Sequence, residues 1–275
     1  MSTQSHRPGD APYTQRTPRV VAAARLRRRR HRDAEGLFLA EGPQAVREAV
    51  ARAGTVVELF GTPEALARYG DLAGAAPRVS PVTDAGLAAL SETVTPQGIV
   101  AVCRHVHGTE VGPAPGLAVL LAGIADPGNA GTVLRTADAA GAGTVVFPEG
   151  TVDPYNGKCV RASAGSLFHV RLVRGPNPVE AVRALRAAGH QVLAADGYGE
   201  ADLDALADDG RLARRTTWIF GSEAHGLDPE LAALADARVR VPIFGRAESL
   251  NLAAAAAVCL YASARAQNRR TGSVD

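Results

Sequence analysis

Apolar positions follow two patterns along this chain: unbroken runs, which predict buried strands, and a spacing of three or four residues, which predicts helices. Apolar runs without alternation are typical of parallel strands that are buried on both faces. In the second half of the chain such runs lie at 117–124, 144–147, 168–172, 192–195, 217–220 and 238–243. Apolar residues three or four positions apart predict helices, at 130–140, 158–165, 178–188 and, in an alanine-rich run, 252–266. Strands that alternate with helices predict an α/β fold with a parallel sheet.

The first half shows the same alternation over a shorter span. Its predicted strands lie at 36–42, 56–59, 79–82 and 98–106, with helices between them. We therefore expect a small α/β domain at 18–106, a Gly- and Pro-rich linker at 107–116 and a second domain at 117–267. The polar stretch 1–17 is expected to be disordered, and residues 268–275 to form a tail.

The composition of the 275 residues narrows the class of protein. Hydrophobic residues make up 46% of the chain, which is enough for a sizeable core, and the formal net charge is only +2. The three cysteines lie far apart without CxxC spacing, so neither a disulfide framework nor a metal site is predicted. Because the chain has no signal-like N-terminus and no apolar run of about 18 residues, we expect a cytoplasmic protein without a membrane segment.

Three loops in the last third of the chain follow strand ends, at 196–199, 220–226 and 241–251. Ligands of open α/β sheets bind beyond the carboxyl ends of the strands, so we expect these loops to form one pocket. Two glycines bracket the middle loop, which carries Glu223 and is either a tight turn or a ligand-facing backbone. Ser249 and Asn251 precede the alanine-rich helix, where they either cap it or belong to a site.

A fourth segment, DPGNAGTVLR, follows the first strand of the second domain. Asn129 is expected to cap the helix at 130–140. Arg135, two turns into that helix, indicates either a surface ion pair or an anion contact, and Arg161 is a second candidate for an anion contact. The chain lacks GxGxxG, GxxxxGK[ST], HExxH and GxSxG motifs, which disfavours an ordinary dinucleotide-binding fold or a serine hydrolase.

Arginines gather near the start of the chain. Eight of them lie between Arg16 and Arg32, most densely in RLRRRRHR. Such a cluster either lines a solvated helix face or contacts phosphates, because grouped guanidinium groups attract polyanions.

Three segments taken together resemble the SpoU (TrmH-like) 2′-O-ribose RNA methyltransferases of the SPOUT superfamily. The matching segments are DPGNAGTVLRTADAAGA with Asn129 and Arg135, IFGSEAHGL with Glu223, and VPIFGRAESLNLAAAAAVCLY with Ser249 and Asn251. The resemblance covers 117–265, and KCVRASAGSLFHV is also similar to the family. RRRRHRDAEGLFLAEG resembles its N-terminal substrate-binding domain, which is similar to a ribosomal-protein fold. The two-domain length also resembles that of actinomycete antibiotic-resistance rRNA methyltransferases.

The resemblance implies methyl transfer from S-adenosylmethionine to a ribose 2′-hydroxyl of RNA. It also implies a trefoil knot in the C-terminal domain and a homodimer whose active sites borrow residues from the partner chain, without a metal. The implied catalytic residues are Asn129, Arg135, Glu223, Ser249 and Asn251. The implied cofactor contacts are Ala195, Gly197, Phe220, Gly221, Gly226, Val241, Ile243, Ser249 and Leu250. The RNA contacts are expected at Arg161, Arg25, Arg27, Arg28, Arg29 and Arg30.

Two aspects of this interpretation stay open. Ribosomal RNA is expected as substrate because a separate domain precedes the catalytic one; the alternatives are a tRNA 2′-O-methyltransferase, a base methyltransferase or a catalytically silent RNA-binding protein. The intact set of five catalytic positions argues against a silent protein. The third motif departs from the family pattern at 246–248, so the sequence does not decide which of these residues contact the cofactor.

Overall fold

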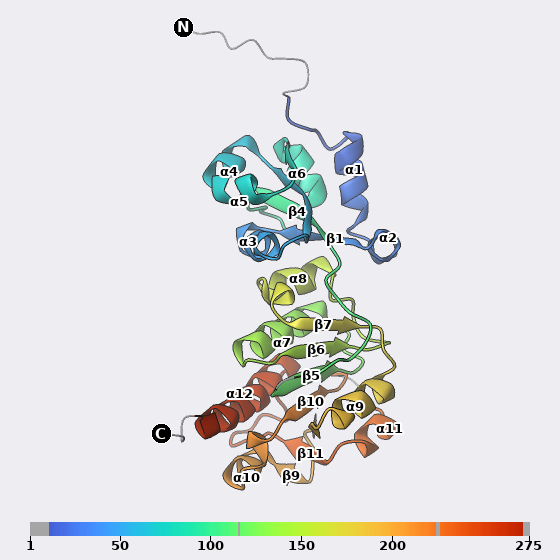
Figure 1. Ribbon diagram of the computed structural model, residues 1–275, viewed down its shortest axis with the longest axis vertical. Helices are drawn as coiled ribbons and strands as arrows, with labels where there is room; N and C mark the ends of the chain where they lie inside the picture. The colour runs from blue at the N-terminus through green and yellow to red at the C-terminus, as the bar shows by residue number, and fades with distance from the viewer. Residues whose placement is uncertain (1–10, 115, 224–225, 272–275) are drawn as a thin grey trace. The chain divides into compact units, whose positions relative to one another are not determined.

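The computed structural model describes residues 11–114, 116–223 and 226–271, and its contacts group them into two compact units (Figure 1). Unit 1 holds residues 11–106 together with Tyr155–Phe168. Unit 2 holds the described residues of His107–Pro154 and those that follow Phe168. Tyr155–Phe168 therefore packs with a sheet that precedes it in sequence by at least fifty positions.

Unit 1 is built on a mixed four-stranded sheet of order β1-β4-β2-β3. The strands are β1 (Leu37–Glu41), β2 (Val56–Gly61), β3 (Val79–Pro81) and β4 (Ile99–Arg104). The helices are α1 (Pro18–Arg25), α2 (Arg29–Glu35), α3 (Pro43–Ala51), α4 (Pro63–Arg68), α5 (Gly70–Ala75), α6 (Asp84–Leu90) and α8 (Gly157–Ser163). Side chains of α1 and α6 pack on one face of the sheet, around Val20, Leu26, Leu87 and Val100. The apolar faces of these short helices are thus buried against the sheet.

Unit 2 is built on a seven-stranded sheet of order β7-β6-β5-β10-β8-β11-β9, in which every pairing is parallel. The strands are β5 (Leu117–Leu121), β6 (Thr144–Phe147), β7 (Arg171–Arg174), β8 (Gln191–Ala195), β9 (Ala201–Asp202), β10 (Thr216–Phe220) and β11 (Ala237–Arg240). The helices are α7 (Pro127–Ala139), α9 (Pro178–Ala187), α10 (Leu203–Asp208), α11 (Pro229–Ala233) and α12 (Leu252–Thr271). Helices α7 and α12 lie on one face, and α9 and α11 on the other (Figure 1). The predicted α/β fold with a parallel sheet is confirmed.

The register of the central strands brings the predicted loops together. Phe220 at the end of β10 is paired with Leu121 of β5 on one side and with Ala195 of β8 on the other. Ala195 is also paired with Val239 of β11. The carboxyl ends of these four strands are therefore side by side, so the chain segments that leave them start at one edge of the sheet.

Three local expectations were wrong. The apolar run 168–172 is not one strand: Phe168 closes a 3₁₀ turn and its ring lies 6.0 Å from that of Phe38, so β7 begins only at Arg171. Of the supposedly disordered residues 1–17, those up to 10 lie outside the described residues, but Tyr13 pairs by backbone hydrogen bonds with Pro81 and Thr83. The C-terminal tail is helical as far as Thr271, because residues 267–271 include no Gly or Pro that would end α12 earlier; residues 272–275 lie outside the described part.

A buried hydrogen bond ties α12 to the sheet and supports a stability prediction. The indole Nε1 of Trp218 donates to the hydroxyl of Ser263 at 2.9 Å, and both residues are fully buried. Ser263→Ala leaves the indole N–H without an acceptor, which we expect to lower the free energy of unfolding by about 1–3 kcal/mol. Urea unfolding measures the change. Adding Trp218→Phe should make the Ser263→Ala change much less costly, and equal costs in both backgrounds would contradict the prediction.

Candidate functional site

Three segments that are far apart in sequence meet at the side chain of Asn129. Its Nδ2 donates to Oε1 of Glu223 at 2.8 Å, and its Oδ1 accepts from Nδ2 of Asn251 at 3.2 Å. Asn129 follows β5, Glu223 follows β10, and Asn251 ends the segment that follows β11. This chain of hydrogen bonds, Glu223–Asn129–Asn251, is called the Asn129 bridge below. It joins the three segments that carry the predicted catalytic residues.

The Asn129 side chain is available for the bridge because another residue caps its helix. Oδ1 of Asp126 accepts the backbone N–H of Asn129 at 2.7 Å, and Pro127 takes the first helical position. The prediction that Asn129 itself caps the helix was therefore wrong: it is the third residue of α7. An aspartate before a helical proline is a favourable start, since the carboxylate satisfies a free N–H near the positive helix end.

Asn251 has both of the roles considered for it. Its Oδ1 accepts the backbone N–H groups of Ala253 at 2.9 Å and Ala254 at 3.4 Å, which caps α12. Its Nδ2 belongs to the Asn129 bridge. The cap fixes the orientation of the amide, so that its donor end points at α7. Ser249 is exposed, and its hydroxyl makes no hydrogen bond with the residues that the structure describes.

The loop after β10 is both a tight turn and part of the bridge. Ser222 and Gly226 exchange two backbone hydrogen bonds of 2.9 Å, and Glu223 lies between them. A Cβ on Gly221 would stand 2.6 Å from the carbonyl oxygen of Gly226, so a side chain at 221 would push this turn aside. Residues 224 and 225 lie outside the described part of the chain.

Arg135 lies on α7 with an exposed side chain. Its guanidinium forms no ion pair or hydrogen bond with the described residues, so the alternative of a surface ion pair finds no support there. Six residues separate it from Asn129, which amounts to about 9 Å along the helix axis and about 120° around it. Arg135 and the Asn129 bridge therefore use different sides of α7.

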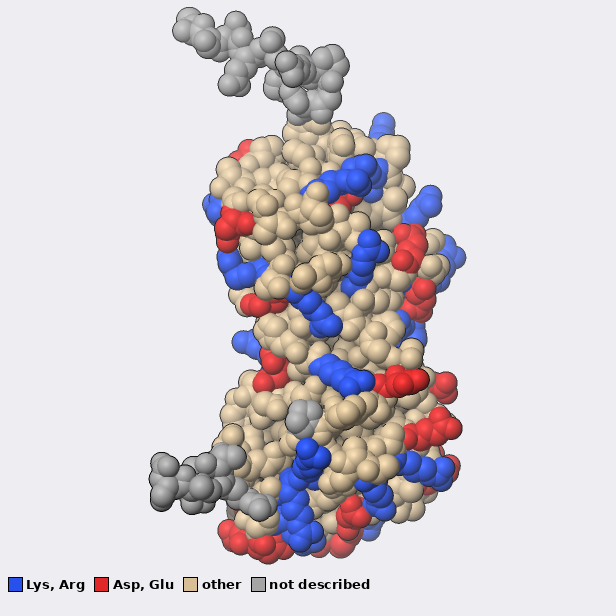
Figure 2. Space-filling model, viewed as in Figure 1, with Lys and Arg blue, Asp and Glu red and all other residues tan. Residues whose placement is uncertain are grey.

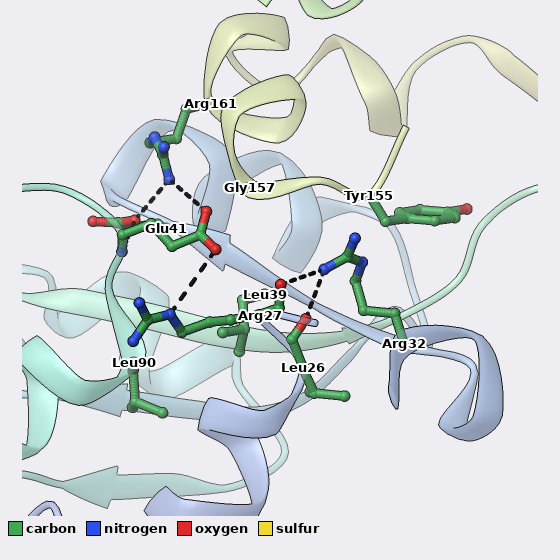
Figure 3. Close-up of a pocket in the computed structure, with 10 residues that line it drawn as sticks. Leu26, Arg27, Arg32, Leu39, Glu41, Leu90, Tyr155, Gly157 and Arg161 are labelled. Carbon is green, nitrogen blue, oxygen red and sulfur yellow. Dashed lines mark hydrogen bonds and ion pairs between the residues drawn. The ribbon is translucent and has the colours of Figure 1, made fainter. Parts of the chain in front are cut away.

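Arg161 belongs to unit 1, where two carboxylates hold it. Its Nη1 lies 3.2 Å from Oε2 of Glu41 and 3.6 Å from Oε2 of Glu92, and Arg27 approaches Glu92 at 3.9 Å (Figure 3). These residues line a cavity of about 20 Å³, which has room for roughly one water molecule. The cavity is thus too small for a nucleotide. Phosphate binding by Arg161 stays a prediction.

The N-terminal arginines divide into one structural residue and an exposed group. Arg32 is 3% exposed, and its Nη1 donates to the carbonyl groups of Leu26 at 3.0 Å and Arg27 at 2.9 Å. The other seven are exposed: Arg16, Arg19, Arg25, Arg27, Arg28, Arg29 and Arg30. On the face drawn in Figure 2, basic and acidic side chains are interspersed rather than gathered into one basic area. Any phosphate contact on this face therefore depends on a small local group of arginines.

The cysteines and the remaining ionisable groups suggest no further chemistry. None of the three cysteines forms a disulfide, and all three are buried. Burial raises the pKa of the Cys259 thiol to about 12 and that of Cys103 well above its usual range. A thiol that stays protonated is a poor nucleophile.

Within the described residues, no group of three His, Cys, Asp or Glu side chains is placed to hold a metal ion. No helix in the same residues combines the length and apolar character that a bilayer span requires.

Comparison with family models identifies two segments. Residues 116–261 match the model of the SpoU rRNA Methylase family, and residues 17–101 match that of the MRM3-like substrate binding domain. The first match contains Asn129, Arg135, Glu223 and Asn251. The chain is 36% identical over 237 residues to the 23S rRNA (guanosine(2553)-2′-O)-methyltransferase RlmP of Bacillus subtilis, which covers 86% of this chain and 92% of the relative.

Solved structures agree with these matches. An AdoMet-bound rRNA methyltransferase from Sinorhizobium meliloti superposes with a TM-score of 0.81 at 30% identity, over 93% of this chain and 97% of its own. The SpoU methyltransferase AviRb from Streptomyces viridochromogenes, in complex with AdoMet, superposes with a TM-score of 0.77 at 29% identity, over 94% of this chain and 99% of its own. The similarity thus extends over both units.

Proposed function

Because the chain belongs to the SpoU rRNA methylase family, we propose that it is an enzyme that methylates a ribose 2′-hydroxyl of ribosomal RNA with S-adenosylmethionine. The observation that carries the proposal is the Asn129 bridge, which gathers polar residues of the three family-like segments at the carboxyl edge of a parallel sheet. A relative that covers most of the chain is named for 2′-O-methylation of 23S rRNA. Ribosomal RNA is therefore preferred to tRNA, and we propose that the enzyme acts in the cytoplasm.

The strand ends suit the proposed cofactor. A Cβ at Gly197 would meet open space, so the backbone there is accessible. Ile243 and Leu250 are exposed apolar residues, of the kind that lines small-molecule sites. We assign the cofactor contacts to Ala195, Gly197, Phe220, Gly221, Gly226, Val241, Ile243, Ser249 and Leu250. When bound, S-adenosylmethionine supplies a methyl group that its sulfonium charge already activates.

The chain's own residues must position the ribose and take up the charge that develops on its oxygen. Arg135 is the group for the second task, since a guanidinium keeps its proton in proteins and can stabilise an alkoxide but hardly act as a base. The Asn129 bridge, with the Ser249 hydroxyl nearby in sequence, fixes geometry by hydrogen bonds. The proton leaves to water or to a phosphate oxygen.

A homodimer with shared sites would reconcile the positions of Arg135 and the bridge. Because the two lie about 120° apart around α7, one protomer can present the bridge while its partner presents Arg135. Helix α12, which packs on α7, exposes Val258 and Tyr261 along one side, an apolar surface that a second copy would cover. We propose this dimer together with a trefoil knot in unit 2, supported by the return of the chain from β11 to a helix that packs near β5.

In unit 1 we propose an RNA-binding domain of ribosomal-protein-like fold at 18–106, joined by the linker 107–116 to the catalytic domain at 117–267. The exposed arginines near its start supply contacts to phosphates. Arg25→Ala, Arg28→Ala and Arg30→Ala together should weaken RNA binding and make the slope of log K against log salt concentration shallower by roughly 2, because each phosphate contact contributes about 0.7–0.9. Fluorescence anisotropy with labelled rRNA at several salt concentrations measures the slope.

A control triple variant removes the same charge elsewhere. Arg68, Arg183 and Arg214 are exposed on other elements, and their replacement by alanine should leave the slope within about 0.5 of the wild-type value. Equal slopes in the two triple variants would indicate that the N-terminal arginines line a solvated helix face and do not contact phosphates.

The function itself is tested by mapping the product. The purified chain is incubated with tritiated S-adenosylmethionine and protein-free 23S rRNA, 16S rRNA or tRNA, and the labelled RNA is digested to nucleosides. We expect a 2′-O-methyl nucleoside from ribosomal RNA. A label on a base indicates a base methyltransferase, a label on tRNA alone changes the substrate class, and cofactor binding without any transfer identifies a silent protein.

A further inference from the structure

Two aromatic rings stand almost fully in solvent at the carboxyl edge of the unit 2 sheet. Tyr198 is 88% exposed and Phe244 is 91% exposed, whereas the other five phenylalanines of the chain are buried. Aromatic residues are only 4% of this sequence, and a ring normally contributes most when its large apolar surface is covered. Two uncovered rings at one edge of the sheet indicate a partner for them.

The ring of Tyr198 is displayed by an ordered turn rather than by a loose loop. Oδ1 of Asp196 accepts the backbone N–H of Tyr198 at 2.9 Å, and the N–H of Gly199 donates to the carbonyl oxygen of Asp196 at 3.0 Å. The N–H of Asp196 is itself bonded to the carbonyl oxygen of Val239 at 3.0 Å. A Cβ at Gly199 would stand 2.5 Å from the carbonyl oxygen of Arg238, so this turn packs directly on β11. Little conformational entropy remains to be lost when the ring is covered.

The two rings come from neighbouring strands at the edge where the proposed methyl transfer takes place. Tyr198 follows β8 and Phe244 follows β11, and these strands pair in parallel through Ala195 and Val239. The segment that carries Phe244 ends at Asn251, a member of the Asn129 bridge. Both rings thus belong to loops that we assign to the catalytic edge.

The chemistry of the Phe244 loop favours a nucleic acid over an apolar protein surface. Arg246, two residues on, is exposed and has no ion pair with the described residues, and Glu248 and Ser249 keep the rest of the loop polar. Aromatic faces beside an available guanidinium are what single-stranded nucleic acids bind, the faces by stacking on bases and the cation by contact with a phosphate. Glu and Ser, in contrast, are depleted in protein-binding surfaces.

We propose that Tyr198 and Phe244 are positioning residues that stack on unpaired nucleobases next to the target ribose, with Arg246 on an adjoining phosphate. RNA is commonly recognised through loop bases that stack on aromatic side chains. Stacking on two sides of the target would hold its ribose still while the 2′-hydroxyl reacts. The inference rests on the proposed function and adds to it the class of substrate: a single-stranded or loop segment of ribosomal RNA rather than a continuous helix.

The test compares Tyr198→Ala, Phe244→Ala and the double variant with the wild type. We expect the KM for 23S rRNA to rise roughly five- to hundredfold in each single variant, with a smaller change in kcat and an unchanged Kd for S-adenosylmethionine by calorimetry. Phe244→Trp should retain the wild-type KM, whereas Phe244→Leu, which is apolar but has no aromatic face, should resemble Phe244→Ala. Val94→Ala, at an exposed apolar residue of unit 1, serves as the control.

Three kinds of outcome with the variants would overturn the inference. A weakened Kd for the cofactor with an unchanged KM for RNA would assign the rings to S-adenosylmethionine. A Phe244→Leu variant as good as the wild type, or a loss of dimer in sedimentation, would assign Phe244 to an apolar protein contact. An unchanged KM in both alanine variants would leave the rings without an RNA role. Wild-type protein that binds labelled rRNA but transfers no methyl group would instead refute the proposed function, and anisotropy with the same variants would still test stacking.

Discussion

Arg135→Ala is expected to reduce kcat for methyl transfer by at least about 10²–10³-fold, the usual cost of removing one donor that stabilises transition-state charge. The guanidinium is exposed and has no partner among the described residues, so its removal breaks no hydrogen bond or ion pair with them. S-adenosylmethionine should therefore bind with an unchanged Kd. Calorimetry with the cofactor and a tritiated-methyl assay with 23S rRNA measure the two quantities.

The control for Arg135→Ala is Arg183→Ala, another exposed arginine on a helix of unit 2. It should keep the wild-type kcat. Arg135→Lys keeps the charge but loses the two-pronged donor geometry, so an intermediate kcat is expected. Full activity of Arg135→Ala would remove this residue from the mechanism, and joint loss of activity and cofactor binding would point to a structural role.

Mixing two inactive variants tests whether a site is shared between protomers. If Arg135 comes from one chain and the Asn129 bridge from the other, a dimer of an Arg135→Ala chain with an Asn129→Asp chain contains one site with both residues intact. Random exchange of equal amounts then restores about one quarter of the wild-type activity, because half of the dimers are mixed and half of their sites are intact. No restoration is expected if each protomer supplies its whole site.

Much of unit 2 could be predicted from local pattern because its strands are buried on both faces. The unbroken apolar runs at 144–147, 192–195 and 217–220 match β6, β8 and β10 to within one residue, and β5 takes up the first five residues of the run 117–124. The order of these strands could not be predicted, since the position of β10 between β5 and β8 depends on crossovers that leave no periodic signal. Tyr155–Phe168 illustrates the same limit. Its apolar side chains indicate burial, but they do not predict that the segment packs with the sheet of unit 1.

The three residues of the Asn129 bridge could be singled out from the sequence, but the hydrogen bonds between them could not be predicted. Residue types alone made Asn129 a helix cap and left Arg135 as either half of an ion pair or an anion contact; only the resemblance to a family grouped them. The bridge spans 94 positions from Asn129 to Glu223 and 122 positions from Asn129 to Asn251. Contacts at such separations are set by tertiary packing. Asp126 was the local signal that was missed, because an aspartate directly before a proline starts a helix better than an asparagine three residues later.

Asn129→Asp is the variant that the bridge makes most informative, because it preserves shape and removes one donor. A carboxylate would replace the Nδ2 that lies 2.8 Å from Oε1 of Glu223, and two carboxylates at that distance either repel or must share a proton. We expect kcat to fall about 100-fold or more, with the bridge broken between α7 and the loop after β10. The tritiated-methyl assay measures the loss, and circular dichroism confirms that the fold is retained.

A swap of donor and acceptor separates the hydrogen bond from the identity of either residue. Glu223→Gln supplies an amide donor, so in the double variant Asn129→Asp, Glu223→Gln the amide of residue 223 can donate to the new carboxylate, while Asn251 still finds an acceptor at position 129. If the bridge serves to hold three segments in register, the double variant should recover at least about tenfold of the activity lost in Asn129→Asp, a coupling of about 1.4 kcal/mol. If instead the Glu223 carboxylate acts directly on the substrate, Glu223→Gln alone is inactive and the swap restores nothing. Recovery of activity in the double variant thus indicates that the bridge acts as a scaffold of hydrogen bonds, and its absence indicates a reacting carboxylate.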